Sequence, residues 1–204
     1  MILAYRCRRW LAAGFVCAYS GLAHAGVTVH VQDDAGKAVA DAAVYLEGGP
    51  AQAKSKRASA EIEQRNKTFI PLVTVVQTGT EISFPNNDTV RHHVYSFSPA
   101  KSFDLKLYAG KPAAPVLFDK SGTVVLGCNI HDQMLAYVQV VDTPYFAKTD
   151  ANGNAKIASP ASGKYSLKVW HYMQPAGSAV HEQSLDYKGD ADINLTVKLG
   201  YKAG

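Results

Sequence analysis

Short runs of alternating apolar and polar residues, separated by glycine and proline, limit what this chain can fold into. In residues 27–31 the valines alternate with Thr28 and His30, and residues 193–199 repeat the pattern near the other end. A period of two is typical of a half-buried β-strand. No segment has the 3.6-residue period of a helix, and roughly nine or ten such runs with turn residues between them indicate β-sandwiches. The sequence therefore predicts an all-β fold.

A thiol, an imidazole and a thioether lie within seven residues, between apolar runs at residues 124–126 and 135–138. They belong to Cys128, His131 and Met134. Thiolate and thioether are soft ligands that favour Cu(I), while imidazole binds Cu(I) and Cu(II), so two His, one Cys and a weak axial Met describe an electron-transfer copper site. The second imidazole must come from another segment, and residues 84–94 offer His92 and His93.

This pattern resembles the cupredoxin family of type 1 blue-copper proteins over residues 60–141. The spacing Cys128-x-x-His131-x-x-Met134 is similar to that of amicyanin rather than the longer loops of plastocyanin or azurin. Residues 118–128 resemble the family's penultimate strand, which rises from a glycine turn and carries the Cys at its end. The resemblance implies a Greek-key cupredoxin β-sandwich that holds one copper ion, Cu(I) or Cu(II).

The resemblance also implies roles for particular residues. The expected ligands are His92, Cys128, His131 and Met134. His131 would be the more exposed ligand, through which electrons pass, and the candidate docking residues around it are Pro85, Ile130 and Leu135. Apart from the resemblance, His30, His171 and His181 are possible additional ligands, although isolated histidines are more often surface or hydrogen-bonded residues.

The choice between the two adjacent histidines follows from strand geometry. Successive side chains of an extended segment point to opposite faces, so His92 and His93 cannot both face the ion without a bulge. The amicyanin-like spacing from Asn86 favours His92 as the ligand. His93, Asn129 and Asn86 then become supporting residues or alternative ligands.

Two positions depart from the family pattern. The residue after the upstream ligand His is commonly Asn, and the residue after the Cys is commonly Ser or Thr; here they are His93 and Asn129. One interpretation is that the Asn129 amide bridges to the His93 ring and restrains the loop. The other is a looser site, which favours a protein that delivers copper.

The segments on either side of residues 58–141 resemble the two halves of a carboxypeptidase-regulatory-like β-sandwich. The first half has the pattern Asp33-x-x-Gly36-x-x-Val39-x-x-Ala42-x-Val44, and the second has Thr149-Asp150-x-x-Gly153 followed by residues 163–170. We therefore expect a discontinuous domain of residues 26–57 plus 142–204, with residues 58–141 inserted as the copper domain. Trp170 is expected in the core of the discontinuous domain.

Residues 1–25 have the three parts of a signal peptide. Arg6, Arg8 and Arg9 precede a short apolar stretch at residues 10–19, and a small-x-small cleavage site ends at Ala25, before Gly26. No stretch approaches the ~20 apolar residues of a membrane-spanning helix. We expect a periplasmic or secreted protein without membrane insertion after cleavage.

Removal of these residues changes both the charge and the cysteine content. It leaves 18 basic and 17 acidic residues, so no excess of positive charge favours nucleic acid or an anionic membrane as a partner. It also leaves Cys128 as a single cysteine. A leftover cysteine in an exported protein indicates a ligating or reactive role.

These features together predict a copper protein that carries single electrons between redox partner proteins and is not an enzyme. Three alternatives remain. A periplasmic copper-binding or delivery protein would use the same ligands, and an envelope structural or adhesive β-sandwich protein would need no metal. A nucleophilic Cys–His pair is the third, but two groups on one tight loop suit shared coordination better than proton transfer.

Overall fold

The computed structural model describes residues 26–50, 58–112, 114–158, 160–175 and 177–200. Within these ranges the chain forms 17 β-strands and no helix, so the all-β prediction is confirmed. None of the described segments is therefore a helix that could cross a membrane. The signal peptide predicted for residues 1–25 lies outside the described residues, as does the passage at residues 51–57.

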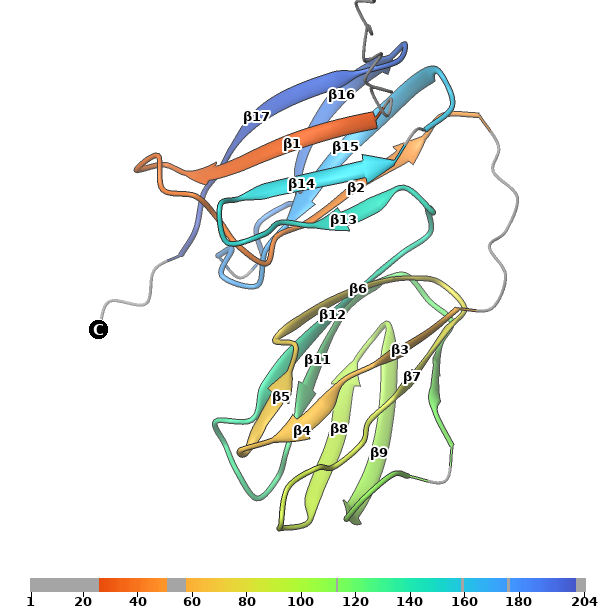
Figure 1. Cartoon of the computed structure of the whole chain (residues 1–204), viewed down its shortest axis with the longest axis vertical. Coiled ribbons are helices and arrows are strands. Elements are labelled where there is room, and N and C mark those ends of the chain that lie inside the picture. The colour runs from red at the N-terminus through yellow and green to blue at the C-terminus, as the bar shows by residue number, and fades with distance from the viewer. Residues whose placement is uncertain (1–25, 51–57, 113, 159, 176, 201–204) are drawn as a thin grey trace, which may run out of the picture.

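Strands from the two ends of the chain form one β-sandwich, here called the flanking unit (residues 26–50 and 142–200; Figure 1). One sheet has the order β14-β1-β17 and the other has the order β13-β2-β15-β16. β1 runs parallel to β17 and antiparallel to β14. The strands are β1 (Gly26–Asp33), β2 (Ala43–Gly48), β13 (Phe146–Lys148), β14 (Asn154–Ala158), β15 (Gly163–Trp170), β16 (His181–Tyr187) and β17 (Ala191–Val197).

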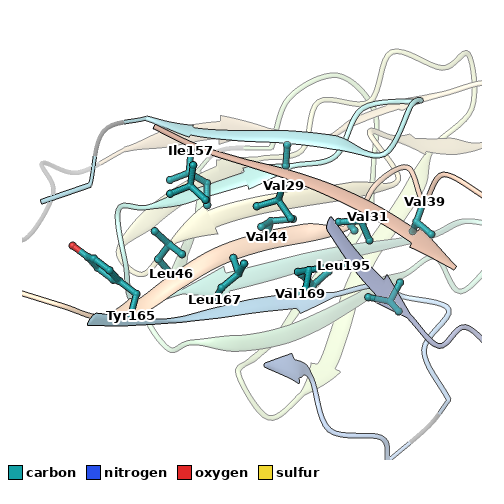
Figure 2. Close-up of a cluster of buried hydrophobic side chains, with 14 of the residues drawn as sticks. Val29, Val31, Val39, Val44, Leu46, Ile157, Tyr165, Leu167, Val169 and Leu195 are labelled. Carbon is teal, nitrogen blue, oxygen red and sulfur yellow. The ribbon is translucent and has the colours of Figure 1, made fainter. Parts of the chain in front are cut away.

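The flanking unit has its own apolar core. Val29 and Val31 of β1 face Leu167 and Val169 of β15 across the space between the sheets (Figure 2). The two-residue alternation explains this, because every second side chain of each strand points inward. The cluster draws on residues 27–46 and 155–197. Independent folding of this unit, and its likeness to carboxypeptidase-regulatory domains, stay predictions.

Residues 58–141 form a second sandwich, here called the central unit (Figure 1). A five-stranded sheet has the order β6-β12-β11-β8-β9, a three-stranded sheet has the order β10-β7-β3, and β4 and β5 form a hairpin. The strands are β3 (Ser59–Glu61), β4 (Glu63–Arg65), β5 (Thr68–Ile70), β6 (Val73–Gln77), β7 (Thr80–Ser83), β8 (His92–Ser98), β9 (Lys101–Tyr108), β10 (Val116–Phe118), β11 (Gly122–Gly127) and β12 (Leu135–Val141).

The core of the central unit is separate from that of the flanking unit. Its buried cluster extends from Ile62 to Val140 and includes Phe84 and Phe118. Cys128 and Met134 belong to the same cluster. The apolar runs on either side of the predicted ligand loop therefore become the central strands β11 and β12, which pair antiparallel.

Residues 68–76 form two strands rather than one, because β5 ends at Ile70 and β6 begins at Val73. Pro71 lies between them, and a proline has no N–H to donate to a strand ladder. The short edge strands β3 and β4 were not expected, because three residues carry too little alternation to be recognised.

The two units contact each other through aromatic and charged side chains. Tyr137 of β12 stacks on Tyr172 with ring centroids 5.1 Å apart and lies 6.1 Å from Trp170. Lys148 Nζ lies 2.6 Å from Asp41 Oδ1 and donates to the Val73 carbonyl at 3.0 Å. The expectation that Trp170 lies in the core was wrong: it follows buried Val169 on β15, so it points out of the sandwich and is half-buried.

Candidate metal centre

Three strands bring the predicted ligands to one end of the five-stranded sheet. β11 ends at Gly127 and β12 begins at Leu135, and these two residues are paired. The seven residues between them therefore form a closed loop that carries Cys128 at one end and Met134 at the other. β8 lies beside β11, with Tyr95 opposite Gly127, so its first residue, His92, reaches the same end.

A glycine at the residue before the thiol leaves room for an aromatic ring. A Cβ atom at Gly127 would lie 3.0 Å from the Tyr95 ring and hydroxyl oxygen, closer than side chains normally approach. The absence of a side chain at Gly127 lets the aromatic ring cover the backbone that leads to Cys128. Tyr95 thereby packs over the end of β11 and restrains the start of the ligand loop.

The loop and β8 place three donor side chains together. The ligand atoms of His92, Cys128 and His131 all lie within 4.8 Å of one another. The two imidazole rings have centroids 5.0 Å apart and meet edge to face at 64°. Met134 is 1% exposed and lies in the same buried cluster as Cys128. Its backbone N–H donates to the His131 carbonyl at 2.9 Å, which tightens the loop.

The burial of these groups leaves two nitrogen atoms without a partner. His92 is fully buried, and Cys128 is 4% exposed. The Nδ1 atoms of His92 and His131 are both buried and have no hydrogen-bond partner. Buried polar atoms are nearly always paired, so two orphaned ring nitrogens beside a buried thiol need an explanation. A metal ion bound by both nitrogens and the thiolate supplies one, and the donor set with a nearby thioether suits copper.

The other ring nitrogen of His92 is held by a carboxylate. His92 Nε2 lies 2.7 Å from Asp88 Oδ2. Burial disfavours the charged form of Asp88, but hydrogen bonds from Lys67, His92 and Asn66 outweigh it and lower the pKa of this carboxyl below its usual value. Asp88 is thus ionised at neutral pH, and its carboxylate is an acceptor that suits a proton on Nε2 of His92. A proton there would leave Nδ1 available to a metal.

Asn86 organises the turn that leads to His92. Its side-chain amide donates to the carbonyls of Val90 at 2.9 Å and Tyr108 at 2.8 Å, and its oxygen accepts from the Asp88 N–H at 3.0 Å. All of these partners lie within the protein, and Asn86 is 3% exposed. The side chain therefore supports the site through the backbone, and its engaged oxygen makes it a poor alternative ligand.

Gln64, which is fully buried, and Tyr108, which is half-buried, form a further polar pair in the central unit. Tyr108 donates its hydroxyl to the Phe84 carbonyl at 2.6 Å and accepts from Gln64 Nε2 at 2.6 Å. Burial raises the pKa of Tyr108 to about 12; the hydrogen bond from Gln64 opposes that rise, and the charge of Cys128 adds to it. The phenol is therefore neutral at ordinary pH, and its hydroxyl links the Gln64 side chain to the Phe84 carbonyl.

The remaining predicted residues have other partners. His93 points away from His92 and pairs through Nε2 with Asp104 of β9, and Asn129 is exposed, so the structure gives His93 a carboxylate partner in place of the expected amide. His30 contacts Asn154 at 2.6 Å and Asp192 at 2.9 Å.

His171 and His181 lie in the flanking unit, as His30 does. His171 lies 3.1 Å from the Ala40 carbonyl. His181 begins β16. In the part of the chain that the structure describes, none of these histidines joins the cluster of His92, Cys128 and His131.

The surface beside His131 is partly apolar. Ile130 is 46% exposed and Leu135 is 45% exposed, as expected for docking residues. Pro85 is buried, so its expected place in a docking surface was wrong. It precedes Asn86 at the foot of the turn, and its carbonyl accepts from the Gln64 N–H at 2.8 Å.

Sequence reasoning missed Asp88, Gln64 and Tyr108. For Asp88 a signal was present, because a carboxylate four residues before a ligand histidine, in a turn rich in Asn, has the short reach that a supporting hydrogen bond needs. Gln64 and Tyr108 gave no such signal. The two residues lie in different strands, 44 residues apart in the sequence, and only the fold brings them together.

Comparisons with known proteins give matches to solved structures. A copper-containing nitrite reductase from Thermus scotoductus is 19% identical over 48% of this chain, with a TM-score of 0.39, and the match spans 25% of the reductase, about a quarter of its length. A purple cupredoxin from Nitrosopumilus maritimus is 20% identical over 40% of this chain and 99% of its own, with a TM-score of 0.36. A reduced amicyanin variant is 16% identical over 48% of this chain and 98% of its own, with a TM-score of 0.38. No protein-family model and no curated protein sequence matches the chain.

Proposed function

We propose that this chain is an exported type 1 copper protein that binds one ion and carries single electrons between redox partner proteins. The observation that carries the proposal is the pair of buried Nδ1 atoms without a hydrogen-bond partner, on His92 and His131, beside the Cys128 thiol. Copper bound there would accept and release one electron.

The residues of the site have two roles: three buried side chains would hold the ion, and one half-buried side chain would connect it to the protein surface. His92, Cys128 and Met134 are nearly or fully buried, so they exclude water and fix the donor geometry from paired strands and a closed loop. Ligands held in place by the fold rearrange little between Cu(I) and Cu(II). His131 is only half-buried and lies next to exposed Ile130, so it would connect the ion to a docked partner.

The same features bear on the rival function of copper delivery. A protein that passes its ion to another must let competing ligands reach the metal. Here His92 is fully buried and Cys128 nearly so, which supports an ion that stays bound while electrons move. We further propose export by the predicted signal peptide, and partners that are proteins rather than nucleic acid.

The proposal is tested by the absorption spectrum of the purified protein after addition of Cu(II). An intense visible band from thiolate-to-copper charge transfer is expected. Cys128→Ser should abolish the band, because a hydroxyl is a weakly acidic, hard donor that cannot replace a thiolate. Asn129→Ser, at the exposed neighbouring residue, should keep the band and serves as the matched control.

Two further measurements complete the test: one checks that the variant is folded, and the other distinguishes electron transfer from copper delivery. Far-ultraviolet circular dichroism should show that the Cys128→Ser variant is folded. Electrochemical cycling of the unsubstituted protein should reduce and reoxidise the copper without loss of metal. A band that survives in Cys128→Ser would remove the thiol from the site, and rapid transfer of Cu(I) to a chelator would favour delivery.

A further inference from the structure

Asp88 lies where two separate segments meet behind His92. Its carboxylate accepts from the backbone N–H of Asn66 at 2.6 Å and of Lys67 at 2.8 Å. The same carboxylate lies 2.7 Å from His92 Nε2. One side chain therefore connects the turn of the β4–β5 hairpin to the first residue of β8.

The hairpin turn has the conformation that this arrangement requires. Asn66 and Lys67 are the two residues between paired Arg65 and Thr68, and both have φ of 54°. Two-residue hairpins favour such positive φ values, which suit Asn but are costly for Lys. In this conformation both backbone N–H groups point to Asp88, and the two hydrogen bonds to a charged acceptor offset the cost.

We propose that Asp88 is the positioning residue of the metal centre: it holds the Nε2 proton of His92, directs the Nδ1 lone pair at the ion, and strengthens that nitrogen as a donor to Cu(II). This inference rests on the proposed function. Ligand histidines commonly donate their second N–H to a carboxylate or carbonyl, and removal of that partner typically weakens metal binding. The β4–β5 turn thus belongs to the site although it supplies no ligand.

The chain contains a matched control for this proposal. His93, adjacent to His92, has its own carboxylate partner in Asp104. The Asp104 side chain is 49% exposed, against 13% for Asp88, and His93 lies outside the cluster of ligand atoms. Asp104→Asn therefore removes the same charge close to the site without touching a proposed ligand.

The experiment uses the full chain with Asp88→Asn and Asp104→Asn. In metal-free protein, ¹⁵N NMR of the imidazoles should show the His92 proton on Nε2 in the unsubstituted protein and in Asp104→Asn. In Asp88→Asn the two tautomers should mix. After loading, Asp88→Asn should lose about tenfold in Cu(II) affinity, at the low end of such effects. Its reduction potential should rise, because Cu(II) loses more than Cu(I) when the imidazole becomes a weaker donor.

Several outcomes would overturn the inference. Equal Cu(II) affinities and potentials in the two variants would show that Asp88 acts only as a nearby charge. A proton on Nδ1 of His92 in the unsubstituted metal-free protein would overturn it without any variant, so the test survives if Asp88→Asn fails to fold. A chain that binds no copper but keeps the Nε2 proton would instead contradict the proposed function and leave the positioning of His92 intact.

Discussion

Met134 is the residue whose chemistry most directly sets the redox behaviour of the proposed site. Met134 is the last residue of the ligand loop, and its side chain is buried. We predict that Met134→Gln keeps copper and lowers the reduction potential, because an amide oxygen favours Cu(II) more than a thioether does. Met134→Leu is the comparison, since it removes the donor but stays apolar, and its potential should rise. Redox titration of both loaded variants measures this, and a raised potential in Met134→Gln would contradict an axial role.

At the scale of elements, the turn between β7 and β8 determines whether His92 is held in place. We predict that Asn86→Ala lowers the free energy of unfolding by about 2–4 kcal/mol, because three side-chain hydrogen bonds are lost and each has a net contribution of about 0.5–1.5 kcal/mol. Copper affinity should fall as well, since Asp88 loses the hydrogen bond that fixes its backbone. Urea unfolding of metal-free protein and copper titration give the two quantities.

Asn87→Ala is the matched control for this turn. Asn87 is exposed, and its backbone N–H to the Gln64 carbonyl is unaffected by the substitution. It should change the free energy of unfolding by less than about 0.5 kcal/mol, as surface changes usually do. Equal losses in both variants would mean that the Asn86 side chain has no special part in the turn.

The elements also show what a sequence can and cannot predict. The loop of Cys128, His131 and Met134 was predictable because all its spacing is local. The two-residue period predicted that only one of His92 and His93 faces inward, and the spacing from Asn86 favoured His92. The parts that failed depend on contacts between distant segments: Tyr108 meets Gln64 only through the fold, and the outward side of Trp170 is covered by Tyr137 of the other unit. Alternation assigns a side chain to a face but cannot say what lies against that face.

At the scale of the whole molecule, the two separate cores predict two units that fold without each other. Deleting residues 58–141 and joining the ends with a short Gly-Ser linker should leave a folded flanking unit. Pro50 and Asp142, the described residues on either side of the deletion, line one surface hollow. Circular dichroism and hydrogen exchange should show protected strands in the joined protein, and neither half alone should fold, because β2 pairs with β15 across the deletion.

An unfolded joined protein would show that the flanking unit depends on its contacts with the central unit. The Lys148 bridge to Asp41 and Val73 is the first contact to examine in that case. Lys148→Met in the full chain tests whether this contact stabilises the flanking unit, because it removes the bridge and keeps both cores complete.

The buried thiol of Cys128 is a probe of how often the site opens to solvent. It is the single cysteine of residues 26–204 and is free. A thiol-specific reagent can therefore modify residues 26–204 at one atom, and only when the ligand loop or the central unit opens. The alkylation rate of metal-free protein then measures how often the site is accessible to solvent. A bound ion holds the thiolate directly, so loading should slow the same reaction in proportion to the time that the ion stays bound.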